Sequence, residues 1–312
     1  MASEPILTAF DVRVAKPNRF RESQIWLDYL ALTKPEVNFL IVVTAFAGFY
    51  LGCDSGWRDF PFLRSVDAVL GTLLVASGTG ALNQYLERGF DAQMRRTSRR
   101  PLAAGRLNPS AVLWFGIMLT VLGTVYLAAT VNLLASLLAL GTLLSYLFFY
   151  TPLKRKSPLC TLVGAFSGAM PPLIGWAAAS GRLGVGAWIL CSVLFLWQFP
   201  HFMSIAWIYR EDYARAGYLV LPHDERARAR LVNWQTLLPL LLLLPVSLLP
   251  ALSRMASPAY SIAALLLCAG FLYYAARFVF RKSNSSARQL LAASILYLPS
   301  LFALVILGGK LQ

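Results

Sequence analysis

Three oxygen-bearing side chains stand four residues apart at the end of a long apolar stretch: Asn83, Glu87 and Asp91. Four residues of helix turn by about 400°, so all three face nearly the same side. Carboxylates held this close repel each other unless a cation lies between them. Mg²⁺ prefers such oxygen ligands and completes its shell with water and substrate phosphates. The spacing predicts a magnesium site at a helix mouth, although Gly89 could loosen the helix and aim Asp91 elsewhere.

A dense run of arginines follows these acids directly. The forked guanidinium of arginine recognises phosphate oxygens, so acids and arginines together indicate a metal–diphosphate site. The alternative is an ordinary charged helix end that anchors the chain by the positive-inside rule. The arginines in question are Arg88, Arg95, Arg96, Arg99 and Arg100.

A second acidic pair, Glu211 and Asp212, follows another apolar block and is flanked by Arg210 and Arg215. If both acidic clusters lie on one side of the membrane, two metal ions can hold one diphosphate as it leaves. The alternative is a charged loop of no catalytic importance.

His201 follows Pro200 inside an apolar block, two to three helical turns before Glu211. Ionisable groups within membrane segments usually face a cavity or serve a function. Three roles stay open for this side chain: proton carrier, haem-iron ligand, or neutral hydrogen-bonding group.

Composition identifies an all-α integral membrane protein. The chain of 312 residues is 58% hydrophobic and 13% charged, whereas soluble domains carry about a quarter charged residues. The net charge of +14 comes from loops between apolar blocks, so it does not indicate a nucleic-acid partner. Only helices satisfy their own backbone in lipid, and about 20 residues span it. Nine such blocks are expected, at roughly 37–51, 66–86, 111–130, 133–150, 159–179, 185–208, 231–249, 260–280 and 290–307.

Basic and non-basic loops alternate along the chain, which places the N-terminus and both acidic motifs on the cytoplasmic side. Residues 1–35 read as a polar tail followed by a short interfacial segment. Residues 36–312 then form one polytopic domain, with nine helices around a central cavity. Pro171 and Pro172 should kink or break the fifth block.

Four stretches resemble the UbiA prenyltransferase superfamily, and within it the branch that farnesylates protohaem IX. The first, NQYLERGFDAQMRRTSRRPLAAGRL, matches the Asn-x-x-x-acid-x-x-x-Asp signature with its basic run and Arg-Pro-Leu. The others are YTPLKRKSP (150–158), GAMPPLIGWAAASG (168–181) and FLWQFPHFMSIAWIYREDYARAGYLVLP (195–222). Together they cover about half the chain.

The resemblance implies a reaction. Mg²⁺ would bridge farnesyl diphosphate to the acids, and the allylic C–O bond would ionise. A vinyl group of haem b would attack the farnesyl cation, and water would trap the resulting cation as the hydroxyethyl group of haem O, which serves respiratory oxidase. It also implies a bacterial cytoplasmic (inner) membrane, with surrounding lipid and haem A synthase or oxidase assembly partners. The implied metal-binding and catalytic residues are Asn83, Glu87, Asp91, Glu211 and Asp212; the diphosphate would bind Arg88, Arg95, Arg96, Arg99, Arg100, Lys154 and Arg155, and His201 would lie on the haem side.

The chain departs from the superfamily at its second motif, Asp-x-x-x-Asp. Aligned on Gly217, those two positions are Tyr209 and Tyr213 here, so the second metal would be held differently or weakly. Other readings remain: prenyl transfer to a quinone or chlorophyll precursor, a membrane transporter, or a non-catalytic oxidase assembly partner. Acids at helix mouths rather than at the midplane disfavour the transporter.

Overall fold

The computed structural model describes residues 22–53 and 59–309, so most of the expected N-terminal tail lies outside the described residues. Within these ranges all regular secondary structure is helical, as expected. The helices are α1 (Glu22–Thr33), α2 (Pro35–Gly52), α3 (Phe62–Asp91), α4 (Pro109–Thr130), α5 (Leu133–Leu144), the π-helix η2 (Ser145–Tyr150), α6 (Thr151–Leu153), α7 (Cys160–Gly168), α8 (Pro171–Ser180), α9 (Val185–Ile208), α10 (Arg210–Arg215), α11 (Glu225–Val246), α12 (Leu249–Leu252), α13 (Pro258–Arg281) and α14 (Asn284–Gly309).

Nine stretches of the described chain are long and apolar enough to cross a membrane, which confirms the expected number. Three of them join consecutive helices: α5 with η2 and α6, α7 with α8, and α11 with α12. The second span differs from its expected limits, because α3 continues as regular helix to Asp91. At its end Glu87 and Asp91 turn inward and pair with Lys154 and Arg100.

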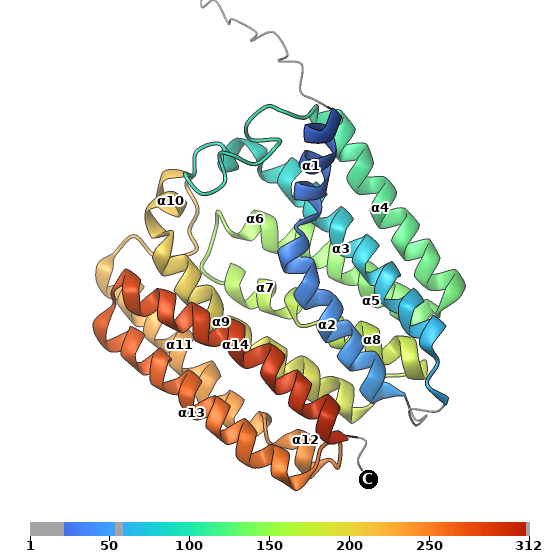
Figure 1. The fold of residues 1–312 in the computed structure, drawn as a ribbon. Coiled ribbons are helices and arrows are strands. Elements are labelled where there is room, and N and C mark those ends of the chain that lie inside the picture. The colour runs from blue at the N-terminus through green and yellow to red at the C-terminus, as the bar shows by residue number, and fades with distance from the viewer. Residues whose placement is uncertain (1–21, 54–58, 310–312) are drawn as a thin grey trace, which may run out of the picture.

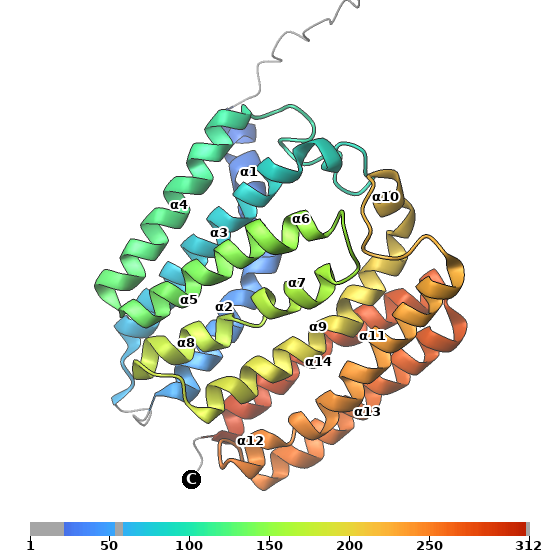
Figure 2. The same cartoon turned by 180° about the vertical axis from the view of Figure 1, so that it is seen from behind.

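The spans lie side by side in a slanted bundle, with α4 at one edge and α13 at the opposite edge (Figure 1; Figure 2, from behind). The most extensive contacts between helices are those of α3 with α4, α2 with α8, and α13 with α14. At Gly175 of α8, a Cβ atom would overlap the carbonyl oxygen of Ala45. Glycine at this position lets the backbones of α2 and α8 touch.

The fourth and fifth spans are not continuous α-helices. The fifth span breaks between α7 and α8, where Pro171 begins the new helix, as the double proline predicts. The fourth span passes through the π-helix η2 before α6, a feature that the sequence does not announce. Single π-turns are frequent at functional sites because they displace side chains from the regular face.

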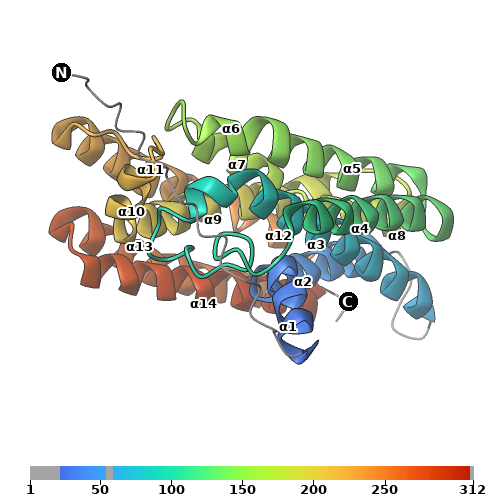
Figure 3. The same ribbon diagram turned by 90° about the horizontal axis from the view of Figure 1, so that it is seen from above.

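One end of the bundle carries the polar groups. Seen from above, the segment after α3 crosses over the helices between α1 and α10 (Figure 3). Arg106 fixes this segment to α1, with Nη2 2.8 Å from Oδ1 of Asp28. The guanidinium of Arg106 holds the pKa of Asp28 below its usual value. The opposite surface of α1 exposes Trp26 and Leu27, as expected of an interfacial segment.

Candidate active site

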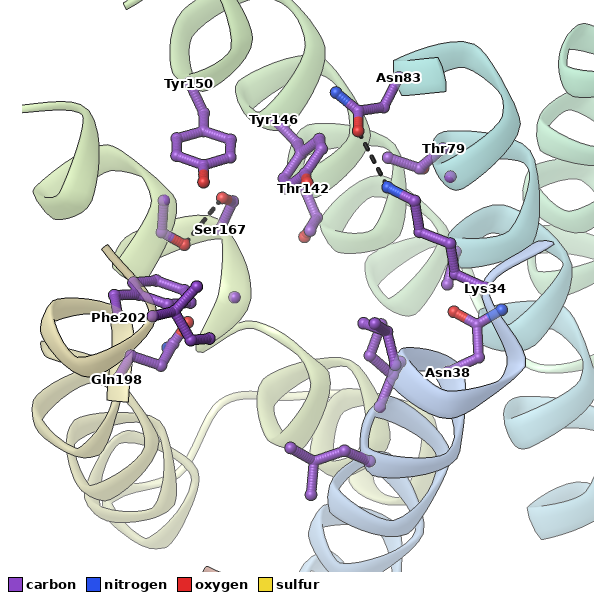
Figure 4. Close-up of a pocket in the computed structure, with 18 of the residues that line it drawn as sticks. Lys34, Asn38, Thr79, Asn83, Thr142, Tyr146, Tyr150, Ser167, Gln198 and Phe202 are labelled. Carbon is purple, nitrogen blue, oxygen red and sulfur yellow. Dashed lines mark hydrogen bonds between the residues drawn. The ribbon is translucent and has the colours of Figure 1, made fainter. Parts of the chain in front are cut away.

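A cavity of about 450 Å³ is lined mainly by α2, α3, α5, η2, α7 and α9 and opens toward the polar end of the bundle. Four cationic side chains and two carboxylates line it near the mouth, and apolar side chains line its depth. Side chains of α2, α3, η2, α7 and α9 point into a common space (Figure 4). The cavity therefore joins a charged entrance to an apolar chamber inside the membrane.

The first predicted triad lies on the wall of this cavity. Asn83, Glu87 and Asp91 all line it, and only 1%, 5% and 1% of their respective surfaces is exposed. Gly89 does not disturb the line, because α3 is continuous through Asp91. The helix thus presents three oxygen-bearing side chains on one face, as their spacing predicts.

A cation of the chain meets each member of the triad. Lys34 donates from Nζ to Oδ1 of Asn83 at 2.9 Å (Figure 4). Lys154 Nζ lies 2.7 Å from Oε1 of Glu87. Arg100 Nη1 lies 2.7 Å from Oδ2 of Asp91, whose Oδ1 is buried without a hydrogen-bond partner. A buried carboxylate oxygen without a donor is costly, and a bound cation would satisfy it.

This donor set fits Mg²⁺. Among the described residues no three His, Cys, Asp or Glu side chains converge as a ligand cluster. The fit therefore rests on Glu87, Asp91 and the amide oxygen of Asn83. One or two carboxylates, with the remaining positions left to water and phosphate, is the usual protein contribution to such a site.

The expected diphosphate-binding residues divide into two groups. Arg96, Arg100 and Lys154 line the cavity. Arg88 instead lies over the ring of Tyr85, and Arg155 over that of Phe90, each with its guanidinium carbon 4.5 Å from the ring centre. Arg95 and Arg99 are exposed and do not line the cavity.

Lys34 is a cavity residue that the sequence did not single out, because it reads as the last charge of a basic tail. It adopts a left-handed conformation (φ 53°) directly before Pro35, which turns its side chain back into the cavity. Burial, together with the positive charges of Arg100 and Lys154, lowers the pKa of Lys34 to about 7. Lys154 behaves oppositely: burial alone would lower its pKa, but Tyr150 and Glu87 raise it well above the usual value.

The second acidic pair does not form a matching ligand set. The side chain of Glu211 is 77% exposed, pairs loosely with Arg210 at 3.7 Å and does not line the cavity. Asp212 is buried behind the wall, where Oδ2 accepts a hydrogen bond from the backbone N–H of Arg96 and Oδ1 faces Arg215. Contrary to expectation, neither acid lines the cavity mouth. They occupy consecutive positions of a short helix, which cannot face the same way.

Tyrosines take the place of acids on this side of the mouth. Tyr213 and Tyr218 line the cavity from the segment of the second motif, and Tyr146 and Tyr150 line it from η2. Lys154 Nζ lies 4.5 Å from the ring centre of Tyr150. The π-faces of these rings attract positive charge, so they can stabilise a cation that forms below the diphosphate. The motif alignment gave a signal for Tyr213 but none for the other three.

The chamber beneath the mouth carries two polar groups on α9. Gln198 donates from Nε2 to the backbone oxygens of Ala165 and Leu194, and its side chain lines the cavity beside Gly168. His201 also lines the cavity, one turn further along. A Cβ atom at position 168 would overlap the amide oxygen of Gln198, so a larger residue there would displace the end of that side chain.

Membrane-spanning helices around such a cavity define a class: a multi-pass membrane protein built to hold an anionic head and an apolar tail. The sequence model of the UbiA prenyltransferase family matches residues 41–302. The chain belongs to this family.

Relatives with named activities cover nearly the whole chain. A protoheme IX farnesyltransferase of Solibacter usitatus is 46% identical over 289 residues, which are 90% of this chain and 98% of the relative. The protein of the same name from Koribacter versatilis is 43% identical over 90% of this chain and 92% of its own length. A third, from Salinibacter ruber, is 42% identical over 90% and 98%.

Solved structures share the fold at low identity. A digeranylgeranylglyceryl phosphate synthase superposes with a TM-score of 0.73 at 16% identity, covering 92% of this chain and 99% of its own. A UbiA homologue from Archaeoglobus fulgidus bound to GPP and Mg²⁺ gives 0.56 at 17% identity, covering 89% and 99%. These likenesses confirm the all-α membrane fold of UbiA type.

Proposed function

We propose that the chain transfers the farnesyl group of farnesyl diphosphate to a vinyl group of protohaem IX, with Mg²⁺, and so makes haem O. The choice of protohaem IX as the acceptor rests on the relatives named protoheme IX farnesyltransferase, which are 42–46% identical over 90% of this chain. The cavity supports the reaction type, because a charged mouth and an apolar chamber suit a diphosphate with an isoprenoid tail.

The diphosphate would bind at the mouth. Lys34, Arg96, Arg100 and Lys154 line it. Because the pKa of Lys34 is about 7, the positive charges exceed those of Glu87 and Asp91 by one when Lys34 is neutral and by two when it is protonated. Diphosphate oxygens can replace the carboxylates as partners of Lys154 and Arg100, since charge-assisted contacts to phosphate are strong. The carboxylates released from these pairs would then be free to hold a metal.

Asn83, Glu87 and Asp91 would hold Mg²⁺. The bound ion would neutralise the diphosphate as negative charge develops on the oxygen of the breaking C–O bond. The chain's own contribution is to keep these oxygens and the surrounding cations in place before the substrate arrives. Asp212 contributes indirectly by holding the backbone of Arg96. Glu211 has no place in this ligand set.

The chamber would control what happens after the allylic C–O bond breaks. Tyr146, Tyr150 and Tyr213 line the cavity near the mouth, where their aromatic faces would stabilise an allylic cation and keep water from it until the vinyl group attacks. Water would then add to the cation left on the vinyl carbon and supply the hydroxyl group of haem O. The acceptor would occupy the α9 side, where His201 and Gln198 supply polar contacts.

The proposal takes residues 36–312 as the prenyltransferase domain in a bacterial cytoplasmic membrane, with the mouth on the cytoplasmic side. The alternation of basic loops supports this orientation. Haem A synthase or oxidase assembly factors would be the partners that receive the product, because haem O is consumed on the way to the oxidase.

The test is reconstitution. The purified protein in lipid nanodiscs receives haem b, farnesyl diphosphate and Mg²⁺, and the extracted haems are examined by mass spectrometry. Haem O is the expected product. A quinone precursor supplied in place of haem tests the competing acceptor; farnesylation of that compound, with haem unchanged, would contradict the proposal.

A further inference from the structure

The imidazole of His201 is held from α14 as well as from its own helix. Its Nδ1 lies 2.8 Å from Oγ of Ser294, which is fully buried. The ring stacks on Trp197 at 4.7 Å between centres, with 23° between the planes. Trp197 in turn donates from Nε1 to the backbone oxygen of Ser294 at 2.8 Å. Two contacts to a single residue of α14 thus fix both the ring and its stacking partner.

The hydroxyl of Ser294 has only one hydrogen to donate. It lies 2.6 Å from the backbone oxygen of Leu291, which can only accept, so that hydrogen is committed there. The remaining contact of Oγ is therefore one in which it accepts. The hydrogen between His201 and Ser294 belongs to Nδ1.

This assignment determines the other nitrogen of the ring. A neutral imidazole carries one hydrogen, so Nδ1–H leaves Nε2 as an unprotonated acceptor. His201 lines the cavity, and no hydrogen bond of its Nε2 is present in the described part of the chain. An unprotonated imidazole nitrogen that faces a cavity can bind a metal ion through its lone pair. Histidines that bind metals commonly donate their other N–H to an oxygen atom.

We propose that Ser294 is a positioning residue that fixes His201 in the Nδ1–H form, so that Nε2 binds the iron of the acceptor. This inference rests on the proposed function for the identity of the iron compound. The tautomer itself depends only on the chain. Ser294 touches neither substrate nor reacting atoms; it acts through the imidazole.

The first experiment reads the tautomer without any substrate. The chain contains two histidines, so His223→Gln leaves a single imidazole for ¹⁵N-histidine NMR. The expected spectrum shows Nδ1 protonated and Nε2 bare, with a mixture of tautomers in Ser294→Ala and recovery in Ser294→Thr. Ser65→Ala is the matched control, because Ser65 is likewise buried and donates to a carbonyl three residues earlier, but lies away from the cavity. An Nε2–H spectrum, or no response to Ser294→Ala, would overturn the proposal.

The second experiment reads the iron. Resonance Raman spectra of the protein loaded with ferrous haem b should show an iron–histidine stretch that is absent in His201→Ala. Because this frequency depends on the hydrogen bond at Nδ1, it should shift in Ser294→Ala, return in Ser294→Thr and stay unchanged in Ser65→Ala. Haem affinity should fall about 10-fold in Ser294→Ala. A wild-type spectrum without the band would overturn the proposal.

Product formation by the wild type separates this inference from the proposed function. Haem O made without an iron–histidine band removes the ligand role and leaves the function standing. Failure to farnesylate haem, with the band present, removes the function and leaves the site standing.

Discussion

Both acidic motifs follow an apolar block in the sequence, but they differ in spacing and in how the structure places them. The first lies on a single long helix, and its three side chains reach the cavity together from one face of α3. The second lies on the six-residue helix α10, where one acid points to solvent and the other is buried behind the wall. Of the acids that the structure describes, only those of the long helix α3 are therefore candidate metal ligands.

The difference also suggests a division of labour between the two sides of the mouth. The α3 side offers oxygen ligands for a metal ion, whereas the α10 side offers aromatic faces and the backbone of the segment after α3. The following predictions test that division in order of decreasing effect.

Metal removal should have the largest effect. Chelation by EDTA should reduce haem O formation to background, because the diphosphate then leaves without charge neutralisation. Added Mg²⁺ should restore the rate of haem O formation, which is measured by mass spectrometry of the product. Haem O formation that continues in EDTA would contradict a metal site on α3.

Asp91→Asn should lower kcat/KM by about 10²–10³-fold, because it removes one of two carboxylates that would stabilise charge in the transition state. Asp67→Asn is the matched control: it lies on the same helix, accepts a hydrogen bond from Tyr126 and does not line the cavity. The control should keep nearly full activity. Equal losses in both variants would point to damage of α3 rather than to a ligand.

Asp212→Asn should have an intermediate effect. It weakens the hydrogen bond to the Arg96 backbone and the pair with Arg215, and costs about 1–3 kcal/mol of stability. We expect kcat/KM to fall about 10-fold with the Mg²⁺ dependence unchanged. A strongly raised Mg²⁺ requirement, measured by titrating activity with the metal, would instead make Asp212 a ligand.

Glu211→Gln should have the smallest effect, less than about twofold on kcat/KM and on stability, because an exposed ion pair contributes little. Parallel rate and melting measurements on Glu211→Gln and Asp212→Asn compare neighbouring positions directly. A larger loss at Glu211 would reverse the assignment of the second motif.

Much of the architecture followed from the sequence. The nine apolar blocks and the break at Pro171 were predicted, because a span must satisfy its own backbone and proline cannot donate to a helix. Spacing also predicted the shared face of Asn83, Glu87 and Asp91, since helical geometry is local. The motifs identified the family that the match over residues 41–302 confirms.

The remaining features needed the tertiary structure, because they join residues far apart in the chain. Lys34 reaches Asn83 across 49 positions, and Ser294 reaches His201 across 93. No periodicity reveals such pairs, because they depend on which helices pack together and how they are rotated. Helix geometry alone separates Glu211 from Asp212, but only packing decided that Asp212 is the buried one and meets the Arg96 backbone. Local geometry thus determined which residues share a helix face, and only the packing of the helices decided which faces meet in the cavity.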